Sequence, residues 1–431
     1  MGFNVDVEAS SSLSGYQSSG TESLQGGVGS QPHRCLAVLS GHEGHVVSLA
    51  LVSDQTLYSG SDRGDIRVSR WPPTQIMQDC DGSQFGRVEG SVKAMVVVGH
   101  KIFTAHQDQK IRMWKCSSKR GAATGHKLVA TLPTVKDHVM TYIMPKSHVQ
   151  VRRHKTALWI DHHDTISVLA LGKGVLYSGS WDKTIKVWRL ADLKCVESIS
   201  AHIDAINALA ADQARGFLYS GSADGTVKVW ERSKTHLMGK THLIRHAAVA
   251  ILEASKHQSV NALALTPQGT TCYAGSSDKC IAVWEMDDEG TGKHMKNVAM
   301  LRGHRLAVLC LATVANLLVS GSADKTIRVW KRNADGLSHQ CLSVLHGHTG
   351  PVKCLAAMLD SAMGTGLMVY SGSMDRSVRV WWTSLIDQDA ESGTSPSSPD
   401  LGFHTPRDSP FPPLFQAGLE SVLRNRLQQC N

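Results

Sequence analysis

The 431-residue sequence lacks the features of several protein classes. Its purely apolar stretches, such as Ala94–Val98, are far shorter than the roughly 20 residues that cross a membrane. Residues 1–32 contain no Lys or Arg, so they lack the early basic region of a secretory or organellar signal. Gly2 could begin a myristoylation motif, but Asp6 stands where that motif needs Ser or Thr. Because eight Ser and six Gly fill residues 1–32, we expect a disordered tail over residues 1–33.

Cysteine spacing and charge exclude further classes. The ten cysteines form no C-x-x-C pair, which argues against a disulfide scaffold and a zinc site and fits a reducing cytoplasmic or nuclear location. The 22 histidines show no metal-ligand spacing, so we expect no metal and no cofactor. The net charge of +8, from 45 basic and 37 acidic residues, permits acidic partners but is too diffuse to indicate nucleic-acid binding.

One segment of twelve residues recurs along the chain. The best copies read YSGSWDKTIKVW, YSGSADGTVKVW, VSGSADKTIRVW and YSGSMDRSVRVW, at Tyr177–Trp188, Tyr219–Trp230, Val319–Trp330 and Tyr370–Trp381. Weaker copies lie at Tyr58–Ser69, Phe103–Trp114 and Tyr273–Trp284. In six of the seven copies an Asp precedes a Trp by six positions, and from Trp188 onward the Trp-to-Trp intervals are 42, 54, 46 and 51 residues. Self-similarity at this period indicates a repeat architecture.

Each copy has the pattern of a β-hairpin. Tyr-Ser-Gly-Ser predicts a short strand, Asp-Gly or Asp-Lys a tight turn, and Thr-Val-Lys-Val-Trp a half-buried strand with alternating polarity. Further strands are expected before each copy, as at Ile206–Ala210, and after it, as at Cys195–Ile199. Seven groups of four short antiparallel strands predict an all-β fold, a single seven-bladed β-propeller.

These repeats resemble the WD40 family over about Arg34–Trp382. Within that family the chain is similar to the plant JINGUBANG-like group, on the segments TLPTVKDHV (Thr131–Val139) and VQVRRHKTALWIDHHDTISVLAL (Val149–Leu171). The resemblance implies a regulator that binds transcription-related partners and tunes developmental or hormone programmes.

The two ends of the repeat region predict how the ring closes. The last copy ends at Trp381–Trp382 without a fourth strand, whereas CLAVLSGHEGHV (Cys35–Val46) supplies a surplus strand before the first copy. This surplus segment reads like CLSVLHGHTGPV (Cys341–Val352), which joins the sixth and seventh copies. We therefore expect Cys35–Leu39 to be the outer strand of the last blade, which removes the open edges between the first and last blades.

Four copies carry a complete His, Ser, Asp and Trp set. The sets are His162, Ser178, Asp182 and Trp188; His202, Ser220, Asp224 and Trp230; His304, Ser320, Asp324 and Trp330; and His348, Ser371, Asp375 and Trp381. Ser, His and Asp together also form hydrolase triads. We interpret the sets as structural because the chain repeats them, and because no G-x-S-x-G or phosphate-binding glycine loop accompanies them. In the family that the sequence resembles, this tetrad is a buried hydrogen-bond network, so we expect no catalytic residues.

The other three copies depart from the pattern. The first has Arg63 for Asp and Ser69 for Trp, with Trp71 two residues further on. The second keeps Thr104 and Asp108 but has no histidine at the matching place. The fifth has Ala274 for Ser, and its His257 is one residue out of register. We expect these blades to be the least rigid.

Candidate partner-binding residues follow from the turns of the repeats. In propellers the turn before the conserved Asp lies on the face where partners usually dock, and the residues before that Asp are Gln107, Trp181, Ala223, Ser277, Ala323 and Met374. Trp181 is the strongest candidate because aromatic anchors are enriched at interfaces, although it could instead pack on a neighbouring loop. Met374, Gln107 and Arg305 are weaker candidates, and a solvated charge is the alternative for Arg305.

Two further segments lie outside the repeat pattern. Within an expected propeller domain of residues 34–383, the stretch near 115–155 is a long basic insertion that could meet an acidic partner; it lacks the interleaved aromatic residues of nucleic-acid binding. The expected disordered tail of residues 384–431 has four Ser-Pro or Thr-Pro steps, and a possible short amphipathic helix follows them. Its candidate phosphorylation sites are Ser395, Ser398, Thr405 and Ser409.

The sequence therefore favours a non-enzymatic scaffold for other proteins, with no membrane partner and no small-molecule substrate. The alternative is a substrate receptor of a cullin-based ubiquitin ligase. Such receptors carry Trp-Asp-x-Arg after the last strand, but here Glu231 follows Trp230 and Ser233 stands where Arg is needed. Fold alone does not choose between these functions.

Overall fold

The computed structural model describes residues 5–6, 33–52, 56–70, 83–117, 125–144, 147–152, 155–235, 243–254, 258–287, 294–333, 335–360 and 366–385. The chain divides into a compact unit, Met1–Ile386, and a second unit, Asp387–Asn431. All the described residues belong to the first unit. The possible amphipathic helix and the four candidate phosphorylation sites lie outside the described residues.

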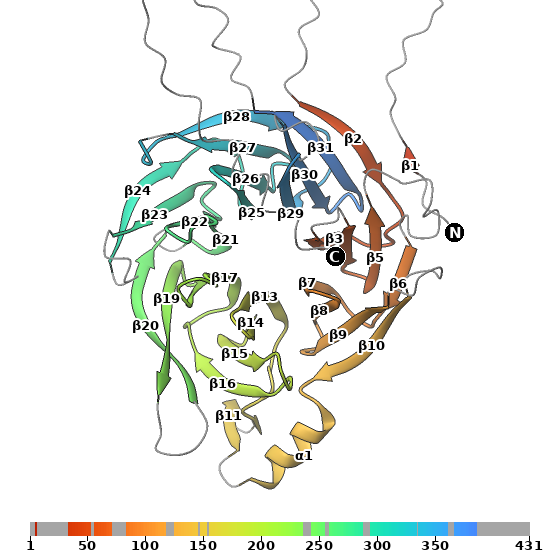
Figure 1. The fold of residues 1–431 in the computed structure, drawn as a ribbon, viewed down its shortest axis with the longest axis vertical. Helices are drawn as coiled ribbons and strands as arrows, with labels where there is room; N and C mark the ends of the chain where they lie inside the picture. The colour runs from red at the N-terminus through yellow and green to blue at the C-terminus, as the bar shows by residue number, and fades with distance from the viewer. Residues whose placement is uncertain are drawn as a thin grey trace, which may run out of the picture. The chain divides into compact units, whose positions relative to one another are not determined.

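The first unit is a ring of seven antiparallel sheets, or blades, as predicted (Figure 1). The strands of each blade are given from the centre outward. Blade 1 consists of β3 (Val46–Leu51), β4 (Thr56–Ser61), β5 (Asp65–Arg70) and β6 (Ser83–Arg87), and blade 2 of β7 (Val92–Val98), β8 (Lys101–His106), β9 (Ile111–Ser117) and β10 (Gly125–Leu132). Blade 3 consists of β13 (Ile166–Gly172), β14 (Val175–Ser180), β15 (Thr184–Arg189) and β16 (Cys195–Ser200).

The next three blades repeat this order. Blade 4 consists of β17 (Ile206–Ala211), β18 (Phe217–Ser222), β19 (Thr226–Thr235) and β20 (Leu243–Glu253). Blade 5 consists of β21 (Val260–Leu265), β22 (Thr271–Ser276), β23 (Ile281–Met286) and β24 (Met295–Leu301), and blade 6 of β25 (Val308–Val314), β26 (Leu317–Ser322), β27 (Ile327–Arg332) and β28 (His339–Leu345). Blade 7 consists of β29 (Val352–Leu359), β30 (Gly366–Ser373), β31 (Val378–Ser384), β2 (His33–Leu39) and a two-residue edge strand, β1 (Val5–Asp6).

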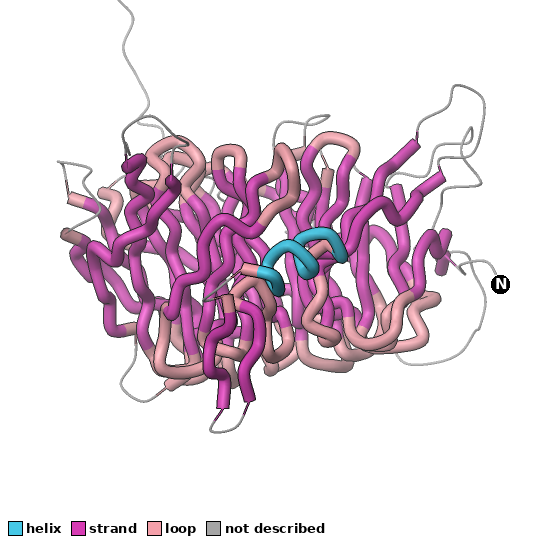
Figure 2. Tube along the Cα trace, turned by 90° about the horizontal axis from the view of Figure 1, so that it is seen from below, coloured by secondary structure: helices cyan, strands magenta, loops and turns pink. Residues whose placement is uncertain are grey.

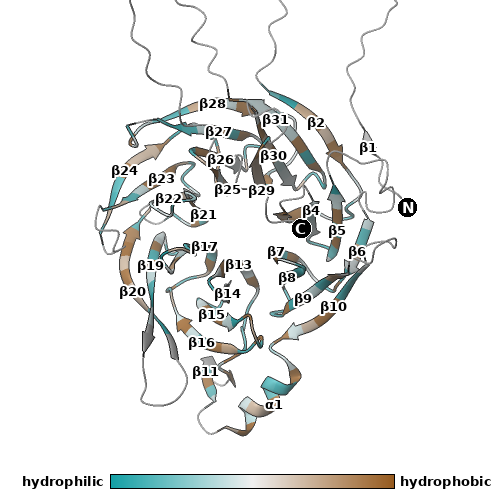
Figure 3. Cartoon of the chain, in the orientation of Figure 1, coloured by the Kyte–Doolittle hydropathy of each residue, from teal (hydrophilic) through white to brown (hydrophobic). Residues whose placement is uncertain are grey.

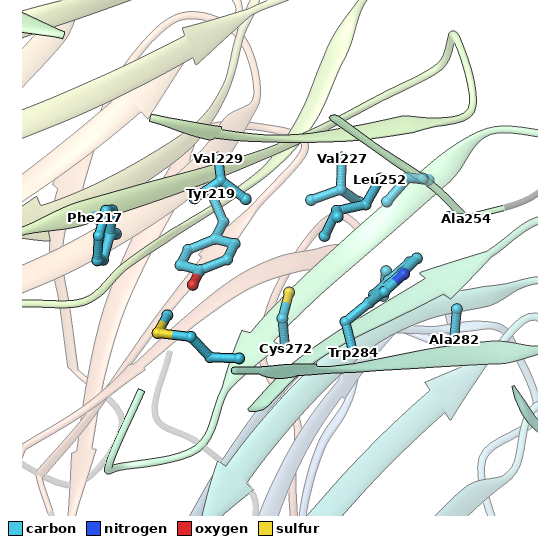
Figure 4. Packing of buried hydrophobic residues seen from close by; sticks show 12 residues of the cluster. Phe217, Tyr219, Val227, Val229, Leu252, Ala254, Cys272, Ala282 and Trp284 are labelled. Carbon is cyan, nitrogen blue, oxygen red and sulfur yellow. The ribbon is translucent and has the colours of Figure 1, made fainter. Parts of the chain in front are cut away.

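The hydrophobic core lies between neighbouring blades. Figure 4 shows one such layer, where Tyr219 and Val229 of blade 4 face Cys272 and Trp284 of blade 5. All six residues of β18 are buried, because the blades on both sides cover this strand. Outer strands such as β28 are instead only partly buried and mix hydrophilic with hydrophobic residues, as the hydropathy colours of Figure 3 show. Because the Tyr-Ser-Gly-Ser strands are buried on both sides, their residues can vary least, which explains why they are the best preserved parts of the repeat.

The glycine of that strand lets adjacent blades approach closely. A Cβ atom added to Gly221 would lie 2.7 Å from Val260 Cγ1 of the next blade, nearer than side chains tolerate. At the closure of the ring, the same relation holds between Gly372 of blade 7 and Val46 of blade 1, at 2.6 Å. Glycine at this position therefore sets the spacing between blades around the ring.

The ring closes as the sequence predicted. Strand β2 pairs with β31 in an antiparallel register that places Cys35 opposite Trp381 and Leu39 opposite Val378. The inner strand of blade 7, β29, contacts β3 of blade 1, so each inner strand touches the next one around the ring. The N-terminal strand thus completes the last blade and ties the two ends of the propeller together.

The basic insertion differs from its predicted extent. Residues 125–132 form β10, which pairs with β9 as the outer strand of blade 2, so part of the stretch near 115–155 belongs to the ring. The additional structure is α1 (Val135–Ile143) and a hairpin of β11 (His148–Arg152) and β12 (Lys155–Leu158). Figure 2 shows α1 along the edge of the ring, about midway between its two faces. The fold is therefore nearly all strand, with one short helix in the described ranges.

Two observations concern cysteines and membranes. All eight cysteines in the described residues are free, in agreement with the absence of C-x-x-C pairs. The structure, where it is described, contains no helix long and apolar enough to span a membrane.

Candidate functional site

The four predicted tetrads each come together around a buried serine. In blade 6, His304 Nε2 lies 2.8 Å from Ser320 Oγ, and His304 Nδ1 lies 3.0 Å from Asp324 Oδ2. Trp330 Nε1 donates to the same Ser320 Oγ at 2.9 Å. The network joins the loop before β25, strands β26 and β27, and the turn between those two strands.

The other three sets have the same geometry. The histidine Nε2 lies 2.7–2.8 Å from the serine Oγ, the histidine Nδ1 lies 2.7–2.9 Å from the aspartate Oδ2, and the tryptophan Nε1 donates to the serine at 2.8–2.9 Å. These sets are His162, Ser178, Asp182 and Trp188; His202, Ser220, Asp224 and Trp230; and His348, Ser371, Asp375 and Trp381. All four serines are fully buried, with an exposed fraction of 0%.

In the networks of His162, His202 and His304, burial lowers the pKa of the histidine and so favours a neutral ring beside an ionised aspartate. Burial lowers the pKa of His304 more than the neighbouring Asp324 carboxylate raises it. Burial alone would raise the pKa of Asp324, but hydrogen bonds from Thr326 and from the Arg305 amide outweigh it and lower that pKa to about 2. Asp182 and Asp375 have pKa values held well below the usual range, against the effect of burial, mainly by hydrogen bonds from His162 and His348.

This arrangement satisfies its own polar atoms and leaves no reactive group exposed. With Asp324 accepting from Nδ1–H of His304, the Nε2 atom accepts the only proton of Ser320, whose oxygen also accepts from Trp330. A hydroxyl that is fully buried and already bonded on both sides has no position from which to attack a substrate. The geometry therefore supports a structural role for the tetrads.

Blade 1 contains a substitute network that the repeat pattern does not reveal. His42 hydrogen-bonds Ser59 Oγ through Nε2, at 2.7 Å, and pairs with Asp65 through Nδ1. Asp65 is the first residue of β5 and lies two positions after Arg63, where the pattern expects the Asp. Its side chain also accepts from Ser61, which places the carboxylate where the turn aspartate lies in other blades. Trp71 lies outside the described residues.

Blade 2 draws its histidine from a different element. His106, the last residue of β8, lies with Nε2 2.7 Å from Thr104 Oγ1, which also accepts from Trp114 Nε1 at 3.0 Å. Burial and the nearby Arg112 charge lower the pKa of His106 to about 3, so the ring is neutral. The sequence signal was the histidine two residues after Thr104, which points to the same face of a strand. In blade 5, Ala274 is fully buried, and His257 lies outside the described residues.

The loop face is the face formed by the turns before the tetrad aspartates and the loops that carry the tetrad histidines. Trp181 lies in one such turn and is 41% exposed; Lys93 Nζ of blade 2 lies 5.5 Å from the centre of its ring. Neighbouring loops expose further large apolar side chains: Ile203 is 80% exposed, Leu306 50% and Met374 37%. Gln107 and Arg305 are exposed on this face too.

Positive charge accompanies these apolar side chains at the centre of the ring. The inner strands line a channel of about 230 Å³, to which β7 and β29 contribute Lys93 and Lys353. Burial and the charge of Lys353 lower the pKa of Lys93. Both lysines are the second residues of inner strands that begin at the loop face, so they lie near this end of the channel. Across the described ranges, no group of three or more His, Cys, Asp or Glu side chains could hold a metal ion.

Comparison with known proteins identifies the repeat. The family model described as "WD domain, G-beta repeat" matches just over half of the chain, at residues 33–68, 154–189, 193–231, 249–285, 295–331 and 339–381. The chain belongs to the WD40 family. The matched ranges omit β7–β10, the strands of blade 2, where the histidine of the network comes from β8.

Curated relatives match only parts of the chain. The chain is similar to Zinc finger CCCH domain-containing protein 17 of Oryza sativa subsp. japonica, with 28% identity over 40% of each protein. Zinc finger CCCH domain-containing protein 59 of Arabidopsis thaliana is 27% identical, over 39% of the chain and 36% of that protein. Myosin heavy chain kinase C of Dictyostelium discoideum is 32% identical, over 36% of the chain and 15% of the kinase. The chain thus spans at most about two fifths of these relatives.

A solved structure supports the fold. The WD40 β-propeller domain of Doa1 has a TM-score of 0.59 and 20% identity to the chain, covering 81% of this chain and 96% of that one. At this identity the likeness concerns the fold alone.

Proposed function

We propose that this chain is a non-enzymatic scaffold that binds other proteins on the loop face around Trp181. WD40 propellers generally bind other proteins, and the buried tetrads offer no reactive group. The observation that carries the proposal is the 41% exposure of Trp181 in a turn whose counterparts are Ala223, Ser277 and Ala323. The turn itself therefore requires no large side chain, and exposed aromatic residues of this kind are typical interface anchors.

The chemistry of the loop face indicates what a partner should present. Ile203 and Leu306 add exposed apolar surface, whereas Lys93 and Lys353 add positive charge at the end of the channel. A partner segment with an apolar side chain and a nearby carboxylate would complement both features. In its pathway, the protein would act as the plant JINGUBANG-like regulators do, by binding transcription-related partners in the cytoplasm or nucleus. This assignment rests on the resemblance of Thr131–Val139 and Val149–Leu171 to that group.

Substitution of Trp181 tests the proposal. The exposed two fifths of a tryptophan amount to about 100 Å² of apolar area, and covering it contributes up to about 2.5 kcal/mol to binding. We expect Trp181→Ala to weaken binding of the main partner at least about tenfold, as measured by calorimetry with the partner recovered from native tissue. Because much of the ring already contacts neighbours such as Lys93, we expect a modest loss of unfolding free energy, about 1–2 kcal/mol.

Leu337 provides the matched control. It is 53% exposed but lies in the connection between β27 and β28, on the face opposite the loop face. Leu337→Ala should leave the affinity unchanged. If Trp181→Ala instead unfolds the chain while the molecules that remain folded bind normally, the ring serves packing and the proposed docking surface is wrong.

A further inference from the structure

Helix α1 is fixed to the edge of the propeller at both ends of the insertion. Leu132 precedes the helix and is fully buried, and Leu158, at the end of the following hairpin, is 7% exposed. Thr134 caps the helix, because its Oγ1 accepts from the Asp137 amide at 3.2 Å. Along the helix, His138 Nε2 lies 2.9 Å from Asp161 Oδ1 of the loop before β13. The orientation of α1 is therefore determined by the ring.

Helix α1 turns its polar face toward the ring and its apolar face outward, the reverse of the usual orientation of a surface helix. The partly buried residues of α1 are Asp137, His138 and Thr141, which share one face at helical spacing. Its apolar residues point outward: the exposed fractions are 82% for Val135, 54% for Val139, 52% for Met140, 69% for Tyr142 and 72% for Ile143. Surface helices normally turn their apolar face to the core, and a contiguous exposed apolar patch indicates an interaction site. Figures 1 and 2 show α1 projecting from the edge of the ring. Tyr142 packs edge-on against His148 of β11, with 5.6 Å between the ring centres, and is still 69% exposed.

The charge of the surrounding segment indicates the chemistry of what covers it. The segment from Lys115 to Lys155, both included, contains nine of the 45 basic residues and only one of the 37 acidic residues. The rest of the chain therefore carries 36 residues of each sign. The entire positive excess of the protein therefore belongs to the segment that contains α1. Lys136, on the helix itself, is exposed, whereas the one acid, Asp137, lies on the partly buried face.

We propose that α1 is a docking helix for a partner protein that presents an apolar groove rimmed by carboxylates. The outward face supplies Val135, Val139, Tyr142 and Ile143 at i, i+4, i+7 and i+8, the spacing by which a helix fills such a groove. The positive segment complements an acidic rim and increases the rate of association. This surface is separate from the loop face, so the proposal goes beyond the proposed function and does not rest on it.

Two other occupants fit the observations less well. A second copy would bring the same positive segment against this one, and like charges repel. A nine-residue helix is also only about 13.5 Å long, too short to supply the roughly 800 Å² per partner of a stable dimer by flat contact. A lipid surface would match the charge, but interfacial helices rely on Trp, Phe and Leu, and α1 has none among its nine residues.

A double variant, Val139→Gln with Ile143→Gln, tests the docking helix. Glutamine is a better helix former than valine or isoleucine, so the helix and its anchored face should persist. The matched control is Ile251→Gln with Met300→Gln, which alters exposed apolar side chains on the outer strands of blades 4 and 5. Full-length wild type, both double variants and Trp181→Ala serve as bait in native tissue extract, and quantitative mass spectrometry identifies the proteins retained by each.

We expect one or more acidic proteins to be lost with the α1 variant and retained by the control and by Trp181→Ala. Produced separately, such a protein should bind the α1 variant at least about tenfold more weakly than wild type. Binding should also weaken with Lys136→Gln and with added salt, as expected for charge complementarity. A photo-crosslinker at Tyr142, on the docking face, should react with an apolar groove flanked by Asp or Glu.

Other results would overturn the proposal. If no retained protein depends on α1, or if the dependent protein is crosslinked outside a groove, α1 is not a docking helix. A wild-type dimer that the α1 variant converts to monomer would assign the surface to a second copy. Binding to phosphatidylserine-containing vesicles that is lost with the α1 variant would assign it to a lipid surface. Partners lost only with Trp181→Ala would support the loop face while refuting the role of α1.

Discussion

Replacement of Ser320 by alanine removes the centre of one tetrad without changing the surface of the protein. Ser320 Oγ is fully buried, lies 2.8 Å from His304 Nε2 and accepts from Trp330 Nε1 at 2.9 Å. The variant loses two hydrogen bonds, each with a net contribution of about 1 kcal/mol, and leaves a buried indole N–H without its acceptor. We therefore expect Ser320→Ala to lower the unfolding free energy by about 2–3 kcal/mol.

Denaturant unfolding measures the overall loss, and amide hydrogen exchange locates it. Protection should fall most in β26 and β27, the strands that carry Ser320 and Trp330. Blade 5 offers the reverse substitution, because Ala274 occupies the serine position of β22, with the same register toward β23 as Ser320 has toward β27. Ala274 is fully buried, so Ala274→Ser adds a hydroxyl that needs a partner there. If Trp284 Nε1 donates to it, as Trp330 does to Ser320, the unfolding free energy should stay within about 1 kcal/mol of wild type; if the hydroxyl finds no partner, it should fall by about 1–3 kcal/mol.

Two results would contradict a structural role for the tetrads. A loss below about 0.5 kcal/mol in Ser320→Ala would show that the network does not stabilise blade 6, because such a value is typical of surface substitutions. Reproducible esterase or protease turnover that disappears in the same variant would show that the serine is catalytic. Either result would refute the reasoning.

Two further predictions concern ring closure and pH. Deleting residues 1–30 should barely change the melting temperature, whereas deleting residues 1–40 removes β2 and should lower it sharply or cause aggregation; equal melting curves would contradict closure by β2. The pKa values of His304 and Asp324 lie below their ordinary values of 6.5 and 3.8 in the folded protein, so both groups stabilise the fold at neutral pH. Stability should fall as the pH drops below about 6.5, because the histidine binds protons in the unfolded chain but not in the folded one. It should fall further between about pH 4 and 2, where Asp324 is protonated in the unfolded chain. A melting temperature that stays constant or rises from about pH 7 to 4 would exclude this linkage.

Much of the ring was predictable because the repeat is short and local. The spacing between Asp and Trp, the Ser-Gly-Ser strands and the surplus strand at Cys35–Leu39 predicted seven blades and their closure, and the structure confirms both. In blade 6 the residues of the tetrad lie within 27 positions of one another, so regular hairpins bring them together wherever the pattern is complete.

The substitute networks were not predictable from the pattern alone. Asp65 lies two residues after the position that the repeat indicates for the aspartate, and it pairs with His42 of the loop before β3. His106 lies on β8 instead of in the loop before the inner strand, and it reaches Thr104 because the two side chains share one face of that strand. Whether a displaced side chain fills the vacant place depends on strand register, rotamer and the neighbouring blade, which no local spacing specifies.

The sequence by itself determined the number of blades, the order of their strands and the polar sets of the four complete blades. Most of these features depend on hairpins formed by residues close along the chain, and the closing strand β2 was recognisable because its sequence repeats the segment before blade 7. Only the tertiary structure decided which surfaces remain open. Lys93 lies over Trp181 although 88 residues separate them, since the inner strands of blades 2 and 3 are neighbours in the ring. Likewise, the sequence of α1 is amphipathic, but only its contacts with the ring decide that the polar face is held inward and the apolar face is presented outward.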